Sequence, residues 1–79
     1  MERNDVEKKV IEIFEEELEI EVASLSMSRA DCEAWDSLMQ LIITGDIEEC
    51  FGIKLPLKTI QEADTIGKFV DCICELSGR

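Results

Sequence analysis

The sequence contains no histidine and only 8 basic residues against 19 acidic ones, and each shortage excludes a class of function. A serine nucleophile needs a base within hydrogen-bond reach, and histidine is the residue that usually supplies it. The net charge of -11 repels nucleic acid phosphates and anionic membrane surfaces, and makes a basic protein surface the natural complement. We therefore expect a protein that is not an enzyme and that binds neither nucleic acid nor membranes.

Signatures of membrane and metal-binding proteins are also missing. No apolar run approaches the roughly 18 residues of a membrane span, and the start of the chain lacks the regions of a signal peptide. The four cysteines form no C-x-x-C pair, and Cys72 and Cys74 would point about 200° apart on a helix, so they cannot easily share a metal ion. We expect a soluble cytoplasmic protein with no metal site.

The spacing of apolar residues predicts an all-α fold, a small bundle of three main helices plus one short helix, in a single domain spanning residues 1–79. The first helix is expected over residues 5–19, with Asn4 as its N-cap and Glu7 as the reciprocal partner. Over residues 20–36 the periodicity fades into a long loop, of a length that is uncommon unless it has a function. Its apolar residues are expected to pin it across the core.

The other helices are predicted from their caps and stops. The second covers residues 37–51, with Asp36 as N-cap and Gly52 as C-terminal stop. A short third helix follows Pro56 over residues 57–62, and Asp64 is expected to cap the last helix. The core face of that last helix has the spacing i, i+3, i+4, i+7 and i+10, and comprises Ile66, Phe69, Val70, Ile73 and Leu76.

The second helix is predicted to have two surfaces. A helical wheel gives a core face of Ile43, Ile47, Cys50 and Phe51. The broad side outside that face carries three apolar residues near Ser37 and three acids further along, namely Leu38, Leu41, Ile42, Asp46, Glu48 and Glu49. Two interpretations remain open. Either the start of the helix is buried, for example under the loop, or these six residues form a docking surface in which acids steer the encounter and apolar contacts hold it.

The start of the second helix, Asp36-Ser37-Leu38 after a long loop, resembles the acyl carrier protein family, including the related peptidyl carrier domains. Segments 47–56 and 65–71 also match, and the length, acidity and helix order agree with the family over nearly the whole chain. The resemblance implies that Ser37 is the attachment point of 4'-phosphopantetheine, transferred from coenzyme A by a phosphopantetheinyl transferase, and that Asp36 assists. The positive end of a helix also favours a phosphodiester there.

The resemblance further implies that the arm carries acyl or aminoacyl groups as thioesters, and that a monomeric carrier presents them to loading and processing enzymes with basic docking surfaces. The sequence departs from the fatty-acid-synthesis type of this family, because Met39 and Ile42 replace acidic residues and Gly45 replaces a bulkier apolar one. These departures favour a specialised carrier for a secondary-metabolite, lipid-modification or amino-acyl pathway. The alternative is a small acidic helical interaction module with no prosthetic group.

Overall fold

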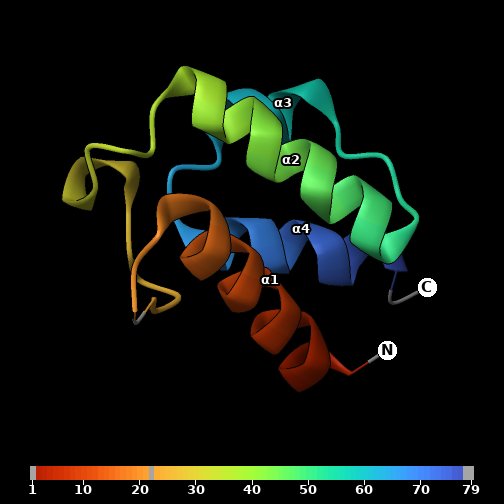
Figure 1. Ribbon diagram of the computed structural model, residues 1–79. Coiled ribbons are helices and arrows are strands. Elements are labelled where there is room, and N and C mark those ends of the chain that lie inside the picture. Colours follow the sequence, from red (N-terminus) through yellow and green to blue (C-terminus); the bar gives the residue numbers. More distant parts are fainter. Residues whose placement is uncertain (1, 22, 78–79) are drawn as a thin grey trace.

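The computed structural model describes residues 2–21 and 23–77, and its elements follow the predicted order. They are α1 (Arg3–Leu18), the 3₁₀ turn η1 (Arg29–Asp31), α2 (Ser37–Phe51), α3 (Leu57–Glu62) and α4 (Ile66–Ser77). Figure 1 shows α2 crossing over α4, with α1 beneath it and the long connection between α1 and α2 gathered at one end. The predicted all-α bundle is confirmed. None of the helices in the described ranges has the length and apolar content that crossing a membrane requires.

The core lies between α1, α2 and α4, and each helix contributes one apolar stripe. Phe14 of α1 is at its centre, with ring centroids 4.8 Å from Trp35 and 5.5 Å from Phe69, both in edge-to-face geometry. Such aromatic pairs add about 0.5–1.5 kcal/mol beyond the area that they bury. Trp35 therefore anchors the end of the long loop directly before α2.

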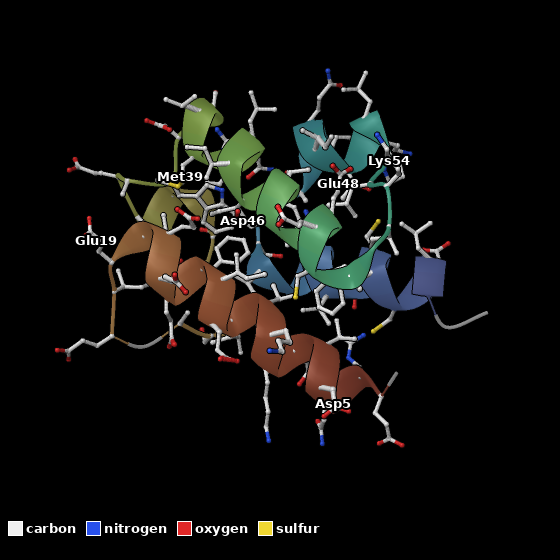
Figure 2. All side chains as sticks on the ribbon, turned by 45° about the vertical axis from the view of Figure 1, so that its right-hand side comes forward. Asp5, Glu19, Met39, Asp46, Glu48 and Lys54 are labelled. Carbon is white, nitrogen blue, oxygen red and sulfur yellow. The ribbon has the colours of Figure 1, made fainter. Side chains whose placement is uncertain are left out.

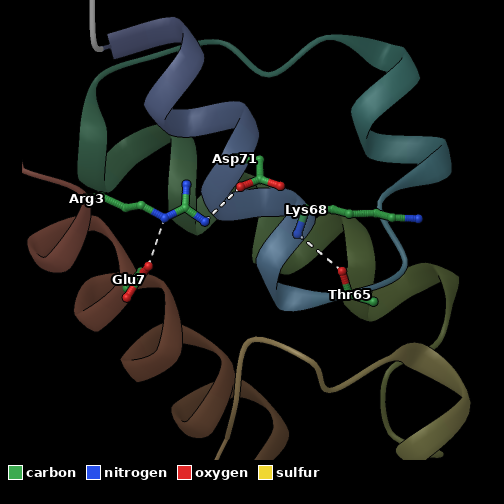
Figure 3. Close-up of polar contacts among 5 residues, drawn as sticks. All are labelled: Arg3, Glu7, Thr65, Lys68 and Asp71. Carbon is green, nitrogen blue, oxygen red and sulfur yellow. Dashed lines mark hydrogen bonds and ion pairs between the residues drawn. The ribbon is translucent and has the colours of Figure 1, made fainter.

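The predicted cap of α1 is wrong. The helix begins at Arg3, so Asn4 lies inside it and forms no capping box with Glu7. Glu7 pairs instead with Arg3 at 2.9 Å, and Arg3 also reaches Asp71 of α4 at 2.8 Å (Figure 3). The start of α1 is thus tied to another helix, a contact that local sequence signals do not report.

Another predicted cap is wrong at the start of α4. Thr65 Oγ1 accepts a hydrogen bond from the Lys68 N–H at 3.2 Å (Figure 3), which is the role expected of Asp64. Asp64 instead forms an ion pair with the Lys68 ammonium at 2.6 Å, and this hydrogen bond lowers the pKa of Asp64. Because α4 begins at Ile66, the residue directly before it is Thr65, and Thr65 takes the N-cap role.

Two residues predicted in the core are exposed. Leu76 is 41% exposed, because α1 begins near Asp71 and α4 continues beyond it by more than one turn. Cys50 is exposed and lies in the last turn of α2, directly before the helix ends at Phe51. The remaining core predictions on these helices are confirmed, although Phe51 is only half-buried.

The long loop is held against the start of α4. The Gly67 N–H donates to the Leu25 carbonyl at 2.8 Å, and a Cβ at position 67 would lie only 3.1 Å from that oxygen, so glycine allows the close approach. An isolated antiparallel bridge joins Ser28 to Thr65, and η1 follows directly. Backbone contacts therefore hold the loop on α4, and two of its apolar residues, Ala23 and Trp35, are buried in the core as expected.

Candidate functional site

Ser37 is the first residue of α2 and is exposed. Asp36 Oδ1 accepts the Met39 N–H at 2.9 Å, and the Asp36 carbonyl accepts the Gln40 N–H at 2.9 Å. The predicted cap and start of this helix are confirmed. Because the first-turn N–H groups and the positive end of the helix dipole are concentrated here, an anion attached to Ser37 would be stabilised.

A buried hydrogen-bond network fixes this entrance. Gln40 is 3% exposed, and its Nε2 donates to the carbonyls of Ile60 and Ala63, both at 2.9 Å, while its Oε1 accepts from the indole Nε1 of Trp35. The network joins the end of the loop, α2 and the end of α3. The sequence prediction missed this role, although Gln40 lies only about 20° from Ile47 on a helical wheel, a position where a polar side chain needs internal partners.

Ser37 opens onto a pocket of about 300 Å³ between α2, α3 and η1. The lining residues combine one cation, two amides, a hydroxyl and apolar side chains, and are Arg29, Ser37, Gln40, Leu41, Ile60 and Gln61. This composition suits an elongated ligand with a hydrogen-bonding body and an anionic end. The pocket wall from α3 was not predicted from the sequence, because it depends on how α2 and α3 pack.

The three predicted apolar residues beside Ser37 are exposed. Leu38, Leu41 and Ile42 are 67%, 58% and 40% exposed, so the interpretation that buries them under the loop is wrong. Leu57, at the start of α3, is also exposed, at 66%, and the sequence did not single it out. Large exposed apolar side chains near one another are typical of interaction surfaces.

The three predicted acids do not share one face of α2. Asp46 lies on the flank toward α1, where its hydrogen bond with Glu17 raises the pKa of Glu17. Glu48 lies on the opposite flank (Figure 2), and its Oε2 accepts the Leu55 N–H at 2.8 Å, which holds the connector to α3. Glu49 is exposed. Of the three, Glu49 is best placed to meet another protein.

Residues 8–73, most of the chain, match the sequence model of a family described as the phosphopantetheine attachment site. The matched range includes Ser37, every residue that lines the pocket beside it, and all of α2 and α3. No curated protein matches the chain. Among the residues that the structure describes, no cluster of histidine, cysteine, aspartate or glutamate is arranged to hold a metal ion.

Proposed function

Since the chain belongs to the phosphopantetheine attachment-site family, that of the carrier proteins, we propose that Ser37 is the residue that bears the prosthetic group. Membership implies a 4'-phosphopantetheine group, a phosphopantetheinyl transferase that attaches it, and enzymes that modify the cargo, while the carrier itself is not a catalyst. Membership in this family also argues against the alternative function, a small interaction module without a prosthetic group. The observation that carries the assignment is the exposed Ser37 at the start of α2, opening onto a mixed polar and apolar pocket.

The chemistry around Ser37 fits modification by another enzyme. Attachment forms a bond between Ser37 Oγ and phosphorus, breaks the pyrophosphate bridge of coenzyme A, and releases adenosine bisphosphate. The Ser37 proton goes to a base of the transferase, because this chain has no histidine. Asp36 lies beside the hydroxyl with its carboxylate exposed, and we assign it an assisting role in the complex with the transferase.

The surface around Ser37 supports a docking role. Of the six residues predicted to dock partners, the exposed ones form the proposed docking surface, namely Leu38, Leu41, Ile42 and Glu49. Asp46 and Glu48 have partners inside the molecule and lie at its flanks. Exposed apolar residues supply contact area, and the negative charge of the chain complements basic partners. Glu48 contributes indirectly, through the connector residue Leu55. The apolar start of α2 favours a specialised carrier of acyl or aminoacyl thioesters, with residues 1–79 acting as one carrier domain.

Intact-mass measurement after incubation with coenzyme A and a broad-specificity phosphopantetheinyl transferase tests the proposal. We expect one phosphopantetheine increment on the wild-type protein and on Ser26→Ala, a control at an exposed serine of the loop. The variant Ser37→Ala is expected to show no increment. Absence of any increment on the folded wild-type protein with several transferases would contradict the proposal.

A further inference from the structure

One cation lines the same pocket as the proposed attachment site. Between Lys9 and Lys54 the sequence contains a single basic residue, Arg29. The fold places Arg29 in the wall of the same pocket that Ser37 opens onto, together with two amide side chains. In a chain of net charge -11, this residue is the charged complement to an anion on Ser37.

The backbone at Arg29 is well fixed. Its N–H donates to the Asp64 carbonyl at 3.0 Å, which ties it to the start of α4. Directly before it, the Ser28 N–H donates to Asp31 Oδ2 at 3.0 Å and closes the capping box of η1. Because the backbone of this turn is already fixed, its side chain loses less conformational entropy on binding a ligand than a side chain on a flexible loop does.

The donors of the Arg29 side chain are available. The guanidinium makes no hydrogen bond or ion pair within residues 2–21 and 23–77, and the side chain is half-buried. Its charge contributes to lowering the pKa of Asp64, but the main partner of that carboxylate is Lys68, at 2.6 Å. Arg29 therefore keeps a planar fork of N–H groups that matches the geometry of phosphate oxygens.

We propose that Arg29 is a positioning residue for the phosphodiester on Ser37, donating hydrogen bonds to its oxygens and holding the arm over the pocket between α2 and α3. This inference rests on the proposed function. The phosphodiester would carry one negative charge, which both the positive end of α2 and the guanidinium would stabilise. An enzyme that takes up the arm would have to compete with this contact, and salt would weaken it.

Phosphorus NMR of the modified protein tests the proposal. The variants are Arg29→Gln and Lys54→Gln, which remove the same charge, the latter at an exposed residue outside the pocket. At low salt we expect Arg29→Gln to move and narrow the phosphodiester resonance, while Lys54→Gln keeps the wild-type spectrum. At about 0.5 M salt, where charges are screened within a few ångströms, the wild-type resonance should approach that of Arg29→Gln.

Identical resonances for wild type and Arg29→Gln at low salt would overturn the role of Arg29. The mass increment is measured first on the same samples, so a failure of Ser37 modification is distinguished from a failure of the Arg29 contact. Arg29→Lys keeps the charge but not the fork, and is expected to give an intermediate shift. Fluorescence of Trp35, the one tryptophan, checks that each variant is folded.

Discussion

Gln40 connects the three segments that surround the proposed attachment site. Its amide donates to the carbonyls of Ile60 and Ala63 and accepts from the indole of Trp35. Trp35 is 2% exposed, so neither side chain can exchange these partners for water. The position of Ser37 relative to the pocket therefore depends on one fully paired side chain one turn further along α2.

Replacing Gln40 should destabilise the fold. The variant Gln40→Leu leaves a buried indole N–H and two carbonyls without these partners, and each unpaired buried group costs about 1–3 kcal/mol. We expect the free energy of unfolding to fall by about 3 kcal/mol, measured by urea unfolding followed through Trp35 fluorescence. Gln61→Leu, at an exposed residue of the same pocket, is the control. An equal loss of unfolding free energy in the two variants would show that the Gln40 network contributes little to stability.

The sequence predicts individual residues well where the signal is local. Asp36 and Gly52 were both assigned correctly, because an N-cap carboxylate and a glycine with a φ of 65° act within one helical turn. Gln40 and Arg29 were not assigned, since the partners of Gln40 and the pocket wall at Arg29 come from segments distant in the sequence.

Among the helices, the contact between α1 and α2 carries a pair of like charges. Glu17 of α1 and Asp46 of α2 share a hydrogen bond that raises the pKa of Glu17. The native state therefore keeps a proton at Glu17 at pH values where the unfolded chain has lost it. The contribution of this pair to stability falls as the pH rises through that window, and it is unfavourable above the window.

The substitution Glu17→Gln should therefore raise Tm at neutral pH, because the amide donates a hydrogen bond to Asp46 without a charge. This increase in Tm should become smaller as the pH falls. It should vanish below about pH 4.5, where Glu17 is protonated in both the native and the unfolded state. Glu12→Gln is the matched control at an exposed residue of the same helix. Thermal unfolding of the three proteins between about pH 3 and pH 8, a range that contains the carboxyl titrations, provides the measurement. A gain that is independent of pH, or equal in the two variants, would contradict the shared proton.

The element boundaries show where sequence signals fail. The ranges of α2 and α3 were predicted correctly from Asp36, Gly52 and Pro56. The caps of α1 and α4 were not, because α1 begins at Arg3, one residue before Asn4, and α4 begins at Ile66, one residue later than a cap at Asp64 requires. Hydrophobic periodicity identifies a helix, but it leaves the first residue uncertain by one or two positions.

At the scale of the whole molecule, the net negative charge and the exposed apolar residues beside Ser37 have separate roles in docking. The residues Leu38, Ile42 and Glu49 have the spacing i, i+4 and i+11, and so form one exposed stripe along α2. Charge should accelerate the approach of a basic partner, while the apolar contacts hold it. The predicted docking surface is thus narrower than the sequence suggested, because Asp46 and Glu48 have partners inside the molecule.

Reversing one charge on this stripe should slow recognition by the transferase. We expect Glu49→Lys to lower kcat/KM for phosphopantetheine transfer roughly three- to tenfold at low salt, with a smaller loss at high salt. The control Glu12→Lys makes the same change in net charge on α1, and should retain wild-type kinetics. Equal losses for the two variants would indicate that total charge, and not this surface, governs the encounter.

The central claim is that the arm is attached to Ser37. Peptide mapping by tandem mass spectrometry of the modified protein tests it most directly, because the chain contains four other serines, at positions 24, 26, 28 and 77. The phosphopantetheine increment is expected on the fragment that contains Ser37 and on no other. An increment on a serine of the loop, or one that persists in Ser37→Ala, would contradict the claim.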